Sequence, residues 1–296
     1  MPTIDLHIHS NKSDGKLTPT EIIDEAKKNN IKTIAISDHD TLEAYNEELF
    51  QYAKDNNIKL IPAVEISTKT NKAGIHILGY NIDINNNKLQ IKLKELRNAR
   101  HDYLHNVSKK LTDLGYMVNV EELDKIEAVT KAHISEQIVK NKENEQILLK
   151  VFNHIPSKGE FIETIMNENC PAYVKKVSIT PKEAADLIRE SNGKVILAHP
   201  VAYTYEDNLS DTEIINIIND IQADGIESYY IYVDRTNNKI NDISKWNKYA
   251  SDLNIITTIG SDFHNFDNHH PSIGLTNEII DLTQLEIDNL INYLTN

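Results

Sequence analysis

Seven short runs rich in β-branched residues, most of them separated by helical stretches, constrain the fold more than any other feature of this chain. Strands are predicted at residues 3–8, 32–37, 59–65, 74–80, 194–199, 225–229 and 255–260. Helices are predicted at residues 18–30, 42–56, 180–191, 211–223 and 240–253, two of which open on a Thr-Pro-x-Glu capping box. Because strands that alternate with helices form parallel sheets covered by helices, this order predicts an α/β sheet or barrel.

One connection interrupts the alternation. Between Ser67 and Gly74 there is no room for a crossover helix, so the third and fourth predicted strands are expected to form a hairpin. The fourth strand then runs opposite to the third. This predicts a distorted barrel in place of a regular eight-fold one.

Residues 85–172 differ from the rest, since charged helical segments dominate there and no clear β run occurs. A long excursion of the barrel is one interpretation, but a structureless loop of that length is implausible. We favour a small helical insertion at 85–172, with a discontinuous barrel built from 1–84 and 173–296.

The net charge of −14 argues against binding of long nucleic acid, which needs a basic surface, and favours small ligands. The single cysteine, Cys170, excludes an intramolecular disulfide and argues against a thiolate metal site. No apolar run is long enough to span a membrane, and the N-terminus runs into a strand pattern with no signal peptide. The chain is therefore expected to be cytoplasmic, with no membrane partner, while its oligomeric state stays open.

His7 and His9 lie two residues apart in the run IDLHIHS and should point to the same face of a strand. Two buried imidazoles side by side repel each other if charged and lack partners if neutral. A shared cation resolves both problems, although an isolated HxH motif also suits an exposed edge strand.

Other histidines and acidic residues follow the ends of the remaining predicted strands, and His76 reaches the same rim if its strand runs backwards. With the opening pair, these residues are His39, Glu65, His76, His199, Asp262 and His264. The carboxyl-terminal rim of an α/β barrel is where active sites are built, so a metal cluster explains them better than scattered surface histidines. Imidazole and carboxylate ligands suit zinc, manganese or iron, and magnesium less well. This many ligands could hold two or three ions.

Three further residues are undecided from the sequence. Glu227 ends the sixth predicted strand, and its contact with metal is left open. His101 and His105 lie four apart on a predicted helix, a spacing that suits a metal ion but occurs more often on a solvated face.

The motifs HxH, SDHDT, AVEIS, HILGY, LAHP, GIE and GSDFH, in this order, resemble the PHP (polymerase and histidinol phosphatase) superfamily. Their details are similar to its nucleotide-phosphatase branch, which includes 3′,5′-nucleoside bisphosphate phosphatases and 5′→3′ exoribonucleases. The resemblance implies a distorted (β/α)7 barrel with an inserted helical domain and a trinuclear metal centre.

The resemblance also implies three ligand sets. The first ion would take His7, His9 and Asp262, with Glu65 bridging to the second; His76 and His199 would complete the second, and Asp14, His39 and His264 would hold the third. Some branches have histidine in place of Asp14. Asp38 and Asp40 would position ligands or handle protons.

Residues of the helical insertion are implied to bind phosphate. Arg97 and Arg100 fit the pattern by which this branch grips a second phosphate, although a solvated helix face explains such a pair about as often. Relatives often have Arg-Pro-His where this chain has Lys131, Ala132 and His133. The lysine keeps the charge but loses the bidentate geometry.

These features together predict a metal-dependent phosphoesterase that hydrolyses a nucleoside 3′,5′-bisphosphate or a short oligoribonucleotide by a metal-activated hydroxide. Histidinol phosphatase is an alternative, but its cationic substrate gives no reason for the arginine pair. A metal-dependent amidohydrolase usually needs a bridging lysine or an eighth βα unit, and neither is evident. A non-catalytic PHP module is a further alternative, but such modules tend to lose ligands.

Overall fold

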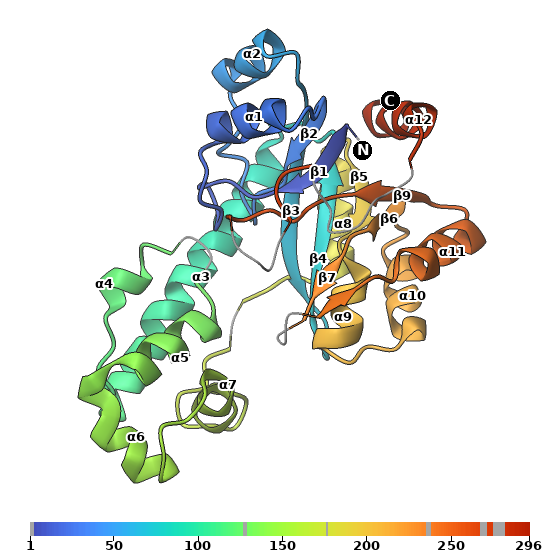
Figure 1. Ribbon diagram of the computed structural model, residues 1–296. Helices are drawn as coiled ribbons and strands as arrows, with labels where there is room; N and C mark the ends of the chain where they lie inside the picture. The colour runs from blue at the N-terminus through green and yellow to red at the C-terminus, as the bar shows by residue number, and fades with distance from the viewer. Residues whose placement is uncertain (1–2, 127–128, 176, 235–237, 267–270, 275–281) are drawn as a thin grey trace. The chain divides into compact units, whose positions relative to one another are not determined.

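The computed structural model describes residues 3–126, 129–175, 177–234, 238–266, 271–274 and 282–296 (Figure 1). The chain divides into two compact units. The first unit comprises Met1–Leu93 and Ile179–Asn296, and the second comprises Lys94–Ser178.

The first unit is built on a seven-stranded sheet in the order β1-β2-β3-β4-β5-β6-β9. Its strands are β1 (Ile4–Ile8), β2 (Thr33–Ile36), β3 (Lys59–Lys69), β4 (Gly74–Tyr80), β5 (Lys194–Leu197), β6 (Gly225–Tyr229) and β9 (Ile256–Ile259). β4 pairs antiparallel with both neighbours, while the other pairs are parallel. The predicted hairpin is therefore confirmed, and its register sets Ser67 opposite His76.

The two edges of this sheet approach each other beyond β1 and β9. Ile8 forms a parallel bridge with Phe263, and the amide of His9 donates to the carbonyl of Phe263 at 2.8 Å. The buried carboxylate of Asp5 accepts from the amides of Ser261 (3.0 Å) and Gly274 (2.7 Å). The result is the nearly closed, distorted α/β barrel that the sequence predicts.

Helices cover the outside of the barrel (Figure 1). They are α1 (Pro19–Lys28), α2 (Glu47–Asp55), α8 (Pro181–Glu190), α9 (Pro200–Glu206), α10 (Asp211–Asp220), α11 (Ile243–Leu253) and α12 (Gln284–Thr295). Both predicted Thr-Pro capping boxes, at Thr18 and Thr180, are present.

Two predicted helix starts are wrong. The helix expected from residue 42 begins at Glu47, because Asn46 caps it and the preceding segment folds back as a turn that places Tyr45 against β2. The helix expected from residue 240 begins at Ile243, because β8 (Lys239–Ile240) pairs with β7 (Tyr232–Val233).

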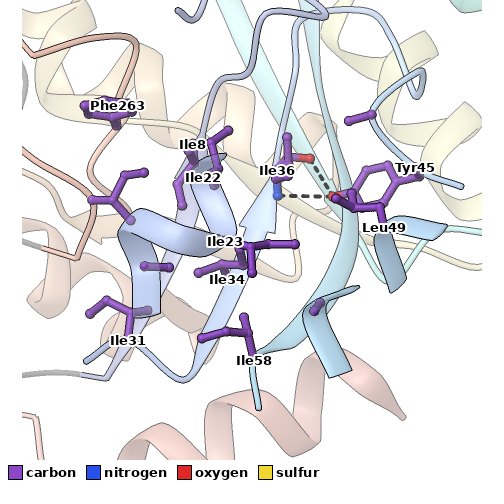
Figure 2. Close-up of a cluster of buried hydrophobic side chains, with 14 residues drawn as sticks. Ile8, Ile22, Ile23, Ile31, Ile34, Ile36, Tyr45, Leu49, Ile58 and Phe263 are labelled. Atoms are coloured by element: carbon purple, nitrogen blue, oxygen red, sulfur yellow. Dashed lines mark hydrogen bonds between the residues drawn. The ribbon is translucent and has the colours of Figure 1, made fainter. Parts of the chain in front are cut away.

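Buried isoleucines dominate the core between α1, α2 and the first strands (Figure 2). Ile8, Ile34 and Ile36 from the strands meet Ile22 and Ile23 from α1, and each of these side chains is fully buried. Burying an isoleucine contributes about 1.5–3 kcal/mol, so this packing fixes β1 and β2, which carry site residues at their ends.

The second unit has an apolar core of its own, made of residues from α3 (Asn87–Asp113), α4 (Val120–Leu123), α5 (Lys131–Lys140), α6 (Glu145–Phe152) and α7 (Lys158–Phe161). Its described residues contain no strand, as expected. It runs from Lys94 to Ser178, whereas the sequence-based boundaries are 85 and 172. The first turns of α3, with buried Leu89 and Leu93, belong to the barrel unit.

Within the described part of the chain, no helix is both long and apolar enough to cross a membrane.

Candidate metal centre

A buried group of four side chains lies at the rim of the barrel, and its ligand atoms are all within 4.8 Å of one another. The group is His7, His9, Glu65 and Asp262. Nε2 of His7 lies 3.1 Å from Nε2 of His9. Asp262 Oδ1 lies 3.3 and 3.1 Å from these two nitrogens, and Glu65 Oε2 lies 3.3 and 3.2 Å from them. A tetrahedral ion with ligands at 2.0–2.1 Å separates them by about 3.3 Å, so the spacing fits one ion.

A second group gathers around Asp14 and contains His9, His39 and His264. The Asp14 carboxylate lies 3.4 Å from His264 Nε2, 3.6 Å from His9 Nδ1 and 3.8 Å from His39 Nε2. His9 thus faces the first group with Nε2 and the second with Nδ1. This is the set implied for a third ion, with His9 beside it.

Glu65 lies between the groups. Its Oε1 is 3.0 Å from His76 Nδ1 and 3.2 Å from His199 Nε2, while its Oε2 is 3.1 Å from His39 Nδ1. The two oxygens therefore face different histidines, an arrangement that suits a carboxylate bridging two ions. All nine residues assigned as metal ligands from the sequence thus lie together in the barrel unit.

Three residues of the rim adopt a left-handed backbone that β-carbon-bearing residues rarely use. They are Asp40 (φ 51°), His199 (φ 23°) and Asp262 (φ 53°). Such conformations cost about 1–3 kcal/mol each and persist where the surroundings enforce them, typically at functional sites. At this rim they turn the chain sharply after a strand, and the side chains of His199 and Asp262 face the cluster.

Charge within the cluster is balanced between imidazoles and carboxylates. Burial would raise the pKa of Glu65, but His39, His76 and His7 outweigh it and hold the pKa well below its usual value. Burial would lower the pKa of His9, but hydrogen bonds that its ring donates to Asp262 and Glu65 raise it to about 10. The facing carboxylates likewise raise the pKa of His7 and of His199 against the effect of burial, whereas burial holds the pKa of His39 well below its usual value. Without an ion, protons on His7, His9 and His199 therefore compensate the buried carboxylates.

Several buried atoms of the cluster lack a hydrogen-bond partner, which is costly unless something else satisfies them. They include Nδ1 of His9 and Nδ1 of His199. Imidazole nitrogens and carboxylate oxygens are the donor atoms that zinc, manganese and iron take in proteins. The residues present therefore fit bound divalent ions.

Glu227, left open by the sequence, has a clear position. Both of its oxygens lie 3.0 Å from Nδ1 of His7, on the side of the ring away from the other ligands, and Oε2 accepts the amide of His199 at 2.9 Å. A carboxylate behind a ligating histidine orients the ring toward the metal. The signals in the sequence were its place in the sixth predicted strand and in the GIE motif.

The carboxylates of Asp38 and Asp40 accept hydrogen bonds from neighbouring chain segments and so stabilise the loops at the rim. Asp38 accepts from the amide and hydroxyl of Ser10 (2.7 and 2.6 Å) and from the hydroxyl of Ser13 (2.6 Å), so it fixes the loop that carries Asp14. Asp40 Oδ1 accepts the amide of Ser67 at 2.9 Å. Their role in moving protons stays a prediction.

A cavity of about 590 Å³ opens onto the cluster. Three tyrosines that sequence reasoning missed line it, and two of them contact cluster residues. The hydroxyl of Tyr230 donates to Asp262 Oδ2 at 3.3 Å, and that of Tyr203 accepts the amide of His76 at 2.8 Å. Tyr230 follows β6, and Tyr203 follows the LAHP motif. Because tyrosine is common in protein cores, these places in the sequence do not by themselves predict a role in the site.

The model of the PHP domain family matches residues 5–195 of this chain. The chain belongs to the PHP family. The match includes the cluster's residues from His7 to His76, while His199, Asp262 and His264 lie beyond it.

Curated relatives of this PHP chain include enzymes that act on nucleotides or RNA. It is 29% identical over 266 residues to a 5′-3′ exoribonuclease of Haemophilus influenzae, covering 88% of this chain and 89% of the relative. It is 28% identical over 268 residues to a 3′,5′-nucleoside bisphosphate phosphatase of Chromobacterium violaceum, covering 89% and 88%. It is 32% identical over 203 residues to the 5′-3′ exoribonuclease Rnm of Escherichia coli, covering 67% and 66%.

Two solved structures share the fold. One, described as an amidohydrolase from Chromobacterium violaceum with bound sulfate and no metal, has a TM-score of 0.71 at 24% identity and covers 94% of this chain and 92% of that one. The other, provisionally named a metal-dependent phosphoesterase from Bifidobacterium adolescentis, has a TM-score of 0.69 at 20% identity, with coverage of 98% and 94%. By its family and its curated relatives the PHP chain is a hydrolase, and the motif resemblance to the nucleotide-phosphatase branch is confirmed.

The predicted phosphate-binding residues all lie in the second unit. Arg97 and Arg100 are on α3, where Arg100 is only 7% exposed, so Arg100 is not part of a solvated face. Lys131 donates to Asn167 at 2.9 Å, and His133 accepts the amide of Thr130 at 3.2 Å as part of the α5 capping box. Their binding of phosphate stays a prediction.

Proposed function

We propose that this PHP phosphoesterase hydrolyses phosphate esters of nucleotides, with a nucleoside 3′,5′-bisphosphate or the end of a short oligoribonucleotide as substrate. The observation that carries the proposal is the cluster around Glu65, where histidines from separate strands meet buried carboxylates beside a cavity. The names of the relatives, two exoribonucleases and a nucleoside bisphosphate phosphatase, support the choice of substrate class.

We assign His7, His9, Glu65 and Asp262 to one ion of this centre. His76 and His199 share Glu65 with a second, and Asp14, His39 and His264 surround a third position. When bound, such ions neutralise phosphate oxygens and lower the pKa of a bound water toward neutrality.

The protein's own contribution is to position these groups and to shape the cavity. Among the described residues that line the cavity there is no serine, threonine, cysteine or lysine. A covalent intermediate on a side chain of these four types therefore lacks a candidate in the described lining. Tyr230 restrains Asp262, and Glu227 restrains His7, so that ligand geometry is set before substrate arrives.

The choice of a bisphosphate over a simple monoester needs a cation for the second phosphate. The described lining of the cavity contains no lysine or arginine. We propose that Arg97 and Arg100 of the helical insertion, aided by Lys131 and His133, supply that cation. This part of the proposal rests on the motif resemblance and on the ability of arginine to hold phosphate in a bidentate manner.

A substrate panel tests the proposal. The purified enzyme would be assayed with adenosine 3′,5′-bisphosphate, a 5′-phosphorylated oligoribonucleotide, adenosine monophosphate, histidinol phosphate and an aryl phosphate, each with manganese, zinc, iron or magnesium. We expect the highest kcat/KM on the bisphosphate or the oligoribonucleotide. An enzyme that prefers histidinol phosphate to every nucleotide would overturn the nucleotide assignment, while inactivity on all esters would overturn phosphoester hydrolysis itself.

A further inference from the structure

A pair of histidines lies on an exposed face of α3 in the second unit, and neither residue belongs to the cluster around Glu65. His101 and His105 are four residues apart, so they lie one above the other on the same side of the helix. Their rings are stacked, with centroids 6.1 Å apart and planes 10° from parallel. The side chains are 55% and 57% exposed, so both are open to ions in solution.

A carboxylate from another element completes the group. Asp124 is the residue that ends α4, and its Oδ1 lies 2.6 Å from Nδ1 of His101 and 3.8 Å from Nε2 of His105. One hydrogen bond accounts for the contact with His101. It does not account for His105, whose nitrogen lies beyond hydrogen-bond range yet faces the same oxygen. One ligand atom from each residue lies within 4.8 Å of the others.

Packing of the second unit holds these residues in register. Leu104 of α3, between the two histidines in sequence, and Leu123 of α4, next to Asp124, are buried in the same apolar cluster. The backbone that carries the three side chains is therefore fixed by the core, and only side-chain rotations are needed to converge on an ion. A site whose backbone is preorganised loses less entropy on binding.

We propose that His101, His105 and Asp124 form a separate site for a divalent transition-metal ion. Two imidazole nitrogens and one carboxylate oxygen favour zinc, copper, nickel or cobalt over magnesium and calcium, which prefer oxygen ligands. The exposure of all three side chains leaves the remaining coordination positions to water. Bound there, the ion joins α3 to α4 across a stretch of chain that the sequence otherwise connects only through a loop, residues 114–119.

The test compares zinc binding by the full-length wild type and by the His101→Ala/His105→Ala double variant. Both proteins would be dialysed against the same series of buffered free zinc concentrations, and metal content would be measured by mass spectrometry. We expect the double variant to bind one ion fewer per chain, with unchanged phosphoesterase turnover. Asp124→Asn keeps both imidazoles and should weaken the same binding step on the order of ten- to hundred-fold.

A second readout separates this site from the cluster around Glu65. Zinc should slow amide hydrogen exchange in residues 114–124 of the wild type and leave it unchanged in the double variant. The matched control is His154→Ala, which removes an exposed histidine of the same unit that pairs with a single carboxylate, Glu160, at 3.0 Å. It should bind as much zinc as the wild type. Equal zinc content and equal exchange in the wild type and the double variant would overturn the proposal.

Discussion

Glu227 sets both carboxylate oxygens 3.0 Å from Nδ1 of His7, and neither side chain is exposed to solvent. The pairing fixes the ring so that Nε2 faces His9, Glu65 and Asp262. Gly260, at the end of β9, makes the arrangement possible, because any β-carbon there would collide with His7 and with Glu227. Residues from β1, from β6 and from the position just after β9 thus orient one imidazole together.

The first prediction concerns Glu227→Gln. The amide keeps the shape of the side chain but loses the charge that steadies the His7 ring, so metal affinity and kcat/KM should both fall about ten- to hundred-fold. Metal content at buffered free manganese or zinc and steady-state kinetics would measure the two effects. Glu190→Gln, which changes a glutamate at the end of α8, is the control and should alter neither. Unaltered affinity in Glu227→Gln would show that His7 needs no such support.

Removal of the ions should inactivate the enzyme and lower its melting temperature. Without an ion, the buried carboxylates of Glu65 and Asp262 depend on histidine protons for compensation. An ion at about 100 times its Kd stabilises the folded state by about 2.7 kcal/mol, which corresponds to several degrees in Tm. Dialysis against a chelator followed by calorimetry would measure the shift, and re-addition of the metal should reverse it. Equal melting temperatures with and without chelator would contradict ion binding at the buried cluster.

A third prediction concerns the support beneath the site. The hydroxyl of Tyr45 donates to the carbonyl of Ile36 at 2.6 Å and accepts the amides of Ile36 (3.1 Å) and Ala63 (2.9 Å), so it joins β2 to β3 just before the Asp38–Asp40 turn (Figure 2). Tyr45→Phe leaves two buried amides without this acceptor. Each buried amide left without an acceptor costs about 1–3 kcal/mol, so the free energy of unfolding of Tyr45→Phe should fall by at least about 2 kcal/mol.

Urea denaturation would measure that loss as a lower midpoint with an unchanged slope. Tyr52→Phe is the matched control. The Tyr52 hydroxyl donates at the surface to Asp24 at 2.7 Å, so its removal leaves no buried polar group without a partner. Its unfolding free energy should stay within about 0.5 kcal/mol of the wild type. If the two variants proved equally stable, the Tyr45 hydroxyl would not be holding the strands together.

The sequence predicts the residues of the rim cluster better than the groups that support them, for a physical reason. A cluster residue such as His39 or Asp262 follows a strand, and the strand ends of a barrel meet at one rim, so the local sequence pattern is enough to predict its place. Glu227 and Tyr45 act through partners that are distant in sequence, and nothing in their neighbours specifies those partners. The same holds for Asp124, since the pairing of α3 with α4 depends on core packing.

The predicted helix starts are wrong where a local helix signal competes with hydrogen bonds to residues distant in the sequence. The run from Leu42 to Tyr45 suits a helix, but the buried bonds of Tyr45 hold it in a turn. Residues 239–240 suit the start of a helix too, but they pair with β7 instead. In both cases long-range hydrogen bonds outweigh a weak local propensity.

The last prediction separates a nucleotide phosphatase from a general one. If Arg97 and Arg100 hold a second phosphate, the double change to alanine should lower kcat/KM for a nucleoside 3′,5′-bisphosphate far more than for an aryl phosphate. A charged hydrogen bond contributes about 1.5–3 kcal/mol, which is roughly ten- to hundred-fold. The loss should fall on kcat/KM because the remote phosphate orients the reacting one.

Arg100 is buried, so its replacement can also disturb α3, and the ratio of the two kcat/KM values is therefore the decisive quantity. A disturbed fold lowers the activity on the bisphosphate and on the aryl phosphate alike, whereas loss of binding to the second phosphate lowers only the activity on the bisphosphate. Changing both arginines to lysine keeps the charge without the bidentate fork and should restore part of the ratio. Lys142→Ala/Lys150→Ala, which removes two exposed charges of the same unit, should leave the ratio unchanged. If the ratio of the two kcat/KM values stayed constant in the arginine variants, these residues would stabilise the helical unit and would not bind the second phosphate of the substrate.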